Sequence, residues 1–140
     1  MPTYNRFEDL KVWNSARALT GMIYRVSGDG KFSRDFGLRD QIRRASVSIM
    51  SNIAEGFESE TQATFVTYLN RAKASAGEVR CQLYIALDLD YLSQDKYNQI
   101  SNLAEECSRQ LYGFIKYLKS QPNIRRVKDN QTTYVLESQF

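Results

Sequence analysis

Apolar residues recur at helical spacing along most of the chain, and no proline interrupts them between Pro2 and Pro122. Proline breaks a helix because it lacks a backbone donor and clashes with the preceding turn, so long helices can form here. In four segments the apolar residues return every three or four positions, which places them on one helix face. These segments are residues 9–27, 38–57, 62–90 and 94–120.

Residues typical of helix ends and turns separate the four segments. We expect helix N-caps at Asp9, at Ser59 or Thr61, and at Ser93. Gly56 is expected near the end of the second helix, and residues 31–37 read as an irregular basic connection. Four long helices joined by short connections favour an all-α fold, an antiparallel up-down-up-down four-helix bundle.

The bundle is expected to occupy residues 1–121, followed by a basic and polar tail at residues 122–140. No strand pattern precedes residue 122. The tail is either mobile or docked on a partner surface, and we favour a mobile tail because terminal segments are loose unless tied down.

The chain contains no histidine, which excludes Ser-His-Asp and Cys-His catalysis and His-ligated metals. Its two cysteines, Cys81 and Cys107, are too few for a disulfide scaffold, and we interpret both as small buried hydrophobes. Glu55 and Glu78 have no nucleophile or ligand set beside them that would make them a catalytic pair. We therefore expect no catalytic residue, no metal site and no cofactor.

No apolar run approaches the roughly 18 residues of a membrane span. The first residues, MPTYNRFEDL, lack the apolar core of a secretory signal, so we expect a cytoplasmic protein with no membrane partner.

Polar residues fall at positions where the second and third helices should meet. These helices are antiparallel about a turn near residues 58–60, so positions whose numbers sum to about 120 lie level. Arg44 and Glu78 are such a pair, and we expect them to be close and buried. The expected structural polar residues are Arg44, Asn52, Glu55, Glu78 and Gln82.

Residues 83–92 are apolar nearly all round the expected helix. Such a segment is buried on more than one side. It is either covered by its own loops or forms a subunit interface, which we favour, with Tyr84, Ile85 or Tyr91 pointing outward. The nine tyrosines of the chain fit an interface, where aromatic residues are enriched.

The net charge of +3, from 19 basic and 16 acidic side chains, is compatible with a polyanionic partner. Arg39 and Arg43 lie four positions apart, either as part of a solvated, ion-paired face or as phosphate contacts. The candidate nucleic-acid-binding residues are Arg39, Arg43, Lys73, Arg125, Arg126 and Lys128.

Three blocks of sequence resemble the four-helix-bundle family of the 23S rRNA intervening-sequence protein. They are Phe7-x-Asp9-Leu10-x-Val12-Trp13, Phe36-Gly37-Leu38-x-x-Gln41-Ile42-Arg43-Arg44-Ala45 and Ser48-Ile49-x-Ser51-Asn52-Ile53-Ala54-Glu55-Gly56. The resemblance spans about residues 6–120. It departs from the family pattern at Lys31-Phe32-Ser33-Arg34, where a proline is usual, and at Ala74, where glycine is common.

The resemblance implies a closed antiparallel bundle without enzymatic activity, often assembled as a ring-like homopentamer. A related branch resembles the accessory variability determinant of diversity-generating retroelements, which binds nucleic acid and a reverse transcriptase. We therefore expect a non-enzymatic homo-oligomer that binds structured RNA or DNA. The alternative is a protein-interaction scaffold, such as the accessory subunit of a reverse transcriptase.

Overall fold

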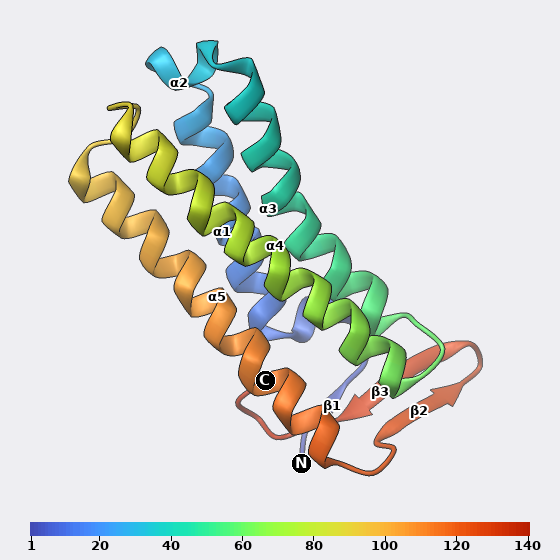
Figure 1. Cartoon of the computed structure of the whole chain (residues 1–140). Helices are drawn as coiled ribbons and strands as arrows, with labels where there is room; N and C mark the ends of the chain where they lie inside the picture. The colour runs from blue at the N-terminus through green and yellow to red at the C-terminus, as the bar shows by residue number, and fades with distance from the viewer.

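The computed structural model describes residues 1–140 and consists of four long helices with a small sheet at one end (Figure 1). The helical elements are η1 (Phe7–Asp9), α1 (Lys11–Ser27), α2 (Gly30–Arg34), α3 (Phe36–Phe57), α4 (Gln62–Asp88) and α5 (Gln94–Ser120). The strands are β1 (Thr3–Tyr4), β2 (Arg125–Lys128) and β3 (Gln131–Val135). The predicted bundle is confirmed, but the expectation of an all-α chain is corrected by the three-stranded sheet.

Each long helix packs against its neighbours in chain order, and the first also closes onto the last. α1 lies against α3 and α5, α3 along α4, and α4 along α5. The apolar stripes meet in one core whose largest fully buried side chains include Phe32, Phe57, Phe65, Phe114 and Tyr134. The core therefore extends from the bundle into the residues that form the sheet.

Capping residues set most of the helix ends. Thr61 and Ser93 are the N-caps of α4 and α5, as predicted, and each accepts a hydrogen bond from the backbone N–H three residues later. Asp35 caps α3 in the same way, so this helix begins two residues earlier than expected. The prediction of Asp9 as the N-cap of the first helix is wrong, because Leu10 takes that position and Asp9 ends the preceding 3-10 turn.

Two other expected boundaries change. The connection at residues 31–37 contains α2, which forms because its Phe32 side chain is fully buried in the core. The predicted end of the second helix at residue 57 is confirmed, and Gly56 in its last turn is buried where α3 meets α4. The third helix ends at Asp88 instead of residue 90.

Residues 122–140 do not form a free tail. β2 and β3 make a hairpin around Asp129 and Asn130, both at positive φ, and β3 also pairs with β1 in the order β1-β3-β2. Tyr134 of β3 is fully buried, with its ring 5.3 Å from Phe57 and 5.1 Å from Phe65. The expectation of a mobile or partner-bound tail is wrong because its apolar residues complete the core of the chain's own bundle.

Hydrogen bonds tie this segment to the helices. The Gln62 amide nitrogen donates to the Leu118 carbonyl at 3.1 Å, and its oxygen accepts from the Ile124 N–H at 2.9 Å. At the other end of the segment, the Lys11 N–H donates to the Phe140 carbonyl at 2.7 Å. The Phe140 ring packs 4.9 Å from that of Phe114, so the segment is held at both ends.

The expected buried pair of Arg44 and Glu78 is wrong. Both residues are exposed, and no ion pair joins them. The predicted register is close, because the Ser48 and Ser75 hydroxyls of α3 and α4 lie 2.9 Å apart. This seam is lined by small side chains such as Ala72, and burying an ion pair there would incur a large desolvation cost.

The other expected polar residues differ in their environments. Gln82 is buried, and Asn52 is half-buried and donates to the Ser48 carbonyl at 2.8 Å. Glu55 is exposed, which corrects its assignment to the structural core, since an unpaired carboxylate is more stable in water.

Candidate nucleic-acid interface

The six residues predicted to bind nucleic acid do not form one surface. Arg39 and Arg43 lie near the start of α3, whereas Arg125, Arg126 and Lys128 belong to β2 at the opposite end of the bundle (Figure 1). Lys73 lies in the middle of α4, where it is exposed and makes no ion pair. Any polyanion that contacts all six would have to follow the full length of the bundle.

Arg43 is held in place by its own chain. Its Nε donates to Ser27 Oγ at 2.8 Å, and its Nη2 donates to the Tyr24 carbonyl at 3.1 Å. The guanidinium also lies over the Tyr24 ring, 4.6 Å from its centroid. Gly28 makes room for it, since a Cβ there would lie 3.3 Å from Arg43 Nη2.

Arg39 is fixed in a similar way at the start of α3. Its Nε pairs with the Asp40 carboxylate at 2.9 Å, and its Nη1 donates to the Ser33 carbonyl at 3.0 Å. The guanidinium lies 4.7 Å from the centroid of the Phe36 ring. Arg39 and Arg43 each use two of their five N–H donors within the chain, so the planes of their guanidinium groups are held while three donors of each stay free.

The three cations of β2 differ in their freedom. Arg125 is half-buried and donates to the Ser59 carbonyl at 2.7 Å, so it fastens the hairpin to the α3–α4 turn. Arg126 is exposed and bonds only to nearby backbone carbonyls, and Lys128 is exposed without a hydrogen bond or ion pair. Arg126 and Lys128 alternate along the strand and so share one face.

Among the four long helices, α1 alone contains no acidic residue, and it carries three basic ones. Lys11, Arg17 and Arg25 are all exposed, and none of them forms an ion pair. The sequence shows this feature as the absence of Asp and Glu from residues 11–27, a signal that no spaced motif carries. We call these three residues the α1 cationic face.

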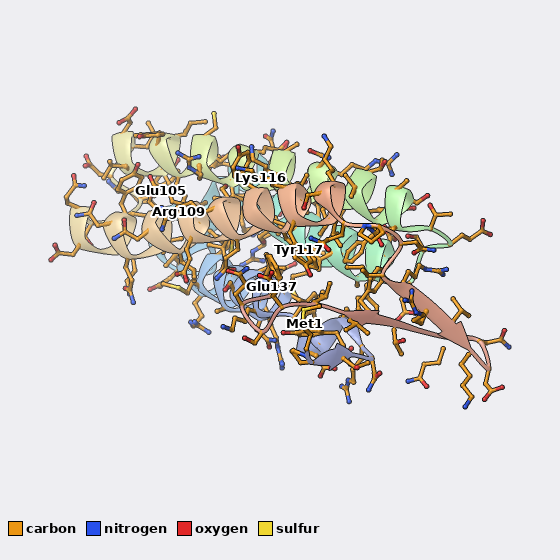
Figure 2. The ribbon with its side chains drawn as sticks, turned by 90° about the horizontal axis from the view of Figure 1, so that it is seen from below. Met1, Glu105, Arg109, Lys116, Tyr117 and Glu137 are labelled. Atoms are coloured by element: carbon orange, nitrogen blue, oxygen red, sulfur yellow. The ribbon has the colours of Figure 1, made fainter.

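The neighbouring α5 carries mixed charges. Arg109 lies 4.0 Å from the Glu105 carboxylate one turn away, and Arg80 of α4 approaches the same carboxylate at 3.8 Å (Figure 2). Lys116, farther along α5, has no acidic partner. The positive potential of α5 is therefore weakened at its centre, unlike that of α1.

An open hollow of about 620 Å³ lies over α3 beside α1. Its lining residues are Tyr24, Asp40, Arg43, Arg44, Val47 and Ser48. Arg44 is exposed there and makes no hydrogen bond or ion pair, so its five donors are free. Arg44 was predicted to be structural, but it is the available cation of this hollow.

The residues expected at a subunit interface separate into two groups. Tyr84 and Ile85 point outward from α4, with 59% and 43% of their surfaces exposed. Tyr91 does not: its hydroxyl donates to the Asp35 carboxylate at 2.9 Å and its ring stacks on Phe32, 5.4 Å away. The prediction that Tyr91 points outward is therefore wrong: its side chain makes contacts within the chain that join the α4–α5 turn to the start of α3.

The same outward side of α4 carries small side chains. Ala74, Gly77 and Cys81 are exposed, and a Cβ on Gly77 would meet nothing within 4 Å. Cys81 was expected to be buried, and its exposure follows from its place on this outward stripe. Cys107 is buried as expected, and burial raises the pKa of its thiol to about 12.

The His, Cys, Asp and Glu side chains form no group of three that would hold a metal ion. No helix combines the length and the apolar character that a membrane-spanning segment requires.

A family model described as 23S rRNA-intervening sequence protein matches residues 8–113. The chain belongs to this family. The match includes α1 to α4 and most of α5, while the three strands lie outside it. Both the α1 cationic face and the hollow over α3 therefore lie within the residues that the 23S rRNA-intervening sequence family model matches.

A solved structure supports the fold. The chain is 26% identical to a protein of unknown function from the S23 ribosomal protein family of Bacteroides thetaiotaomicron VPI-5482. The match covers 77% of this chain and 97% of that one, with a TM-score of 0.70. A search of curated proteins finds no match.

Proposed function

We propose that the protein is a non-catalytic helical bundle that binds the phosphate backbone of structured RNA or DNA through the α1 cationic face. The observation that carries this proposal is the absence of any acidic residue from α1 beside three exposed, unpaired cations. Unpaired surface cations release counterions when they meet phosphates, which supplies most of the sequence-independent affinity of such complexes.

Neighbouring residues support this interpretation. Arg44 adds an unpaired cation on α3, and the small exposed Ala18 lies next to Arg17 on α1. Arg126 and Lys128 offer a second, separate contact on the hairpin. The net charge of one chain is modest, so assembly of several copies would strengthen binding through linked sites.

The test compares two charge reversals of equal size. Arg17→Glu with Arg25→Glu alters α1, and Lys116→Glu with Lys119→Glu alters exposed lysines of α5 by the same net charge. Binding of labelled RNA and DNA hairpins is followed by fluorescence anisotropy over a salt series. We expect the α1 variant to lose affinity and to reduce the log–log salt slope by about 0.7 to 0.9 for each contact removed. Equal losses in both variants would reject α1 as the interface.

A second candidate function is a protein-interaction scaffold, and the outward side of α4 favours it. Ala74, Gly77, Cys81, Tyr84 and Ile85 form an exposed stripe of small and apolar residues, where helices of another chain can approach closely. The proposed partners are further copies of this chain, five being the number that the family resemblance suggests, or a protein such as a reverse transcriptase. Sedimentation of Ala74→Glu against the unaltered chain tests assembly, and a monomeric unaltered chain would contradict it.

A further inference from the structure

Two exposed aromatic rings each have an arginine stacked over them at one end of the bundle. The Tyr24 ring carries the Arg43 guanidinium at 4.6 Å, and the Phe36 ring carries that of Arg39 at 4.7 Å. Despite these partners, Tyr24 remains 44% exposed and Phe36 63% exposed. The rings of the other two arginine–aromatic pairs, Trp13 with Arg17 and Tyr68 with Arg71, are half-buried, so only these two pairs present an open ring beside a cation.

Both pairs lie along one face of α3. Phe36 and Arg43 are seven positions apart, so they share a face and are separated by two turns, about 10.5 Å. Tyr24 joins this face from α1 through its contact with Arg43. Arg44, the unpaired cation of the hollow over α3, lies next to them. We call Tyr24, Phe36, Arg39, Arg43 and Arg44 the stacking face.

The hydrogen bonds of the two stacked arginines fix their planes. Arg43 is tied to Ser27 and to the Tyr24 carbonyl, and Arg39 to Asp40 and the Ser33 carbonyl. These bonds use two of the five donors of each arginine and limit how far its guanidinium can turn toward a phosphate. The guanidinium groups present flat surfaces, as do the rings, and both kinds of surface stack on nucleobases.

We propose that the stacking face binds single-stranded nucleic acid, with unpaired bases stacked at Tyr24–Arg43 and Phe36–Arg39 and a phosphate on Arg44. This inference rests on the proposed function, and it adds the form of nucleic acid recognised: a loop, bulge or single-stranded end. A duplex keeps its bases stacked inside and offers only phosphates to this face. Asp40, the one carboxylate within the hollow, is neutralised by Arg39 at 2.9 Å.

Base stacking and phosphate contact give different salt signatures, and the experiment uses this difference. Tyr24→Ala, Phe36→Ala and Arg44→Ala are compared with the unaltered chain for binding oligouridine, oligothymidine and a blunt duplex. Tyr112→Ala on α5, where 59% of the residue is exposed, is the matched control. Tyr24→Phe and Phe36→Tyr keep a ring, and unchanged thermal unfolding shows that each variant is folded.

We expect the two aromatic-to-alanine variants each to weaken single-strand binding by about 5-fold to 100-fold, with the salt slope unchanged. Arg44→Ala should reduce the slope by about 0.7. The ring-keeping variants should bind like the unaltered chain, and the relative affinities of the two strands show whether RNA or DNA is preferred. If Tyr24→Ala and Phe36→Ala bind single strands as tightly as the unaltered chain, this inference is wrong, while the proposed function of α1 still stands. Failure of the unaltered chain to bind any oligonucleotide at low salt would overturn the proposed function with it.

Discussion

Gly56 of α3 lies so close to Phe65 of α4 that a Cβ on the glycine would stand 2.8 Å from Phe65 Cδ1. The same atom would be 2.7 Å from Tyr68 Cβ, a distance that real side chains do not reach. The two helices therefore touch through a position that has no side chain. This close approach fixes the end of the bundle on which Tyr134 and the sheet pack.

Replacing Gly56 by alanine should destabilise the protein by about 1 to 2 kcal/mol. The overlap with Phe65 and Tyr68 costs about 1 to 3 kcal/mol, and the higher helix propensity of alanine offsets part of it. Urea unfolding measures the difference. Gly77→Ala is the control: a Cβ at Gly77 of α4 meets nothing within 4 Å, so this variant should gain about 0.5 to 1 kcal/mol. Equal effects at both glycines would contradict the role of the close contact.

The buried Cys107 thiol should make stability fall at alkaline pH. Burial raises its pKa from 9.0 to about 12, and the Glu106 carboxylate adds to the shift. Above pH 9 the unfolded chain loses this proton and the folded chain keeps it, so the unfolded state binds fewer protons. Full stability is present below pH 9 and decreases by about 1.4 kcal/mol per pH unit up to about pH 12.

Urea unfolding of the unaltered chain and of Cys107→Ala, measured between pH 9 and pH 10, checks this effect. The substitution leaves a small cavity at every pH, but it should remove the alkaline slope due to the thiol. Cys81→Ala is the control, because Cys81 is exposed. A slope that survives in Cys107→Ala would assign the pH dependence to another group.

The helical part of the fold was predictable because its causes are local. The last helix, at residues 94–120, was predicted with the bounds that the structure shows, since Ser93 caps it and Pro122 follows its end. The sheet was missed for the opposite reason. β3 is stabilised by the contact of Tyr134 with Phe57 and Phe65, which lie about 70 residues earlier, and no pattern within residues 122–140 reveals that contact.

For the candidate site, the sequence indicated residue types but not the direction in which they point. Arg44 and Glu78 are almost level, but small residues such as Ala72 bring α3 and α4 too close for two long side chains, and both point into solvent. Arg39 and Arg43 were identified as basic neighbours. Their stacking on Phe36 and Tyr24 was not, because the second pair joins two helices.

The buried hydroxyl of Tyr134 lies beside Arg125 but makes no hydrogen bond of normal geometry, so removing it should not weaken the fold. Burial raises the pKa of this hydroxyl to about 12, and the positive charge of Arg125 opposes the shift. Tyr134→Phe keeps the ring contacts with Phe57 and Phe65 and removes an unpaired polar atom, whose burial costs about 1 to 3 kcal/mol. We expect unchanged or higher stability in urea unfolding. A clear loss would indicate a hydrogen bond that the hydroxyl makes in solution.

Tyr134→Ala, in contrast, should cost about 3 to 5 kcal/mol because it empties a large buried volume. Deleting residues 122–140 should be at least as severe, because it also removes Leu136 and the chain that Gln62 binds. A truncated protein as stable as the full chain would show that the sheet adds nothing to the bundle. Thermal unfolding followed by circular dichroism measures both variants.

The three cations of β2 should respond differently to alanine. Arg126 and Lys128 are exposed on the hairpin, so their joint replacement should leave stability within about 0.5 kcal/mol. If they contact phosphate, the same replacement should weaken binding of RNA or DNA hairpins and lower the salt slope by about 0.7 to 0.9 per contact.

Arg125→Ala should instead destabilise the fold, because the Arg125 guanidinium donates to the Ser59 carbonyl at 2.7 Å. Its loss leaves the hairpin without its bond to the α3–α4 turn. Paired measurements of unfolding and binding on these variants separate the two roles. An unchanged salt slope in the double variant would confine binding to α1 and α3.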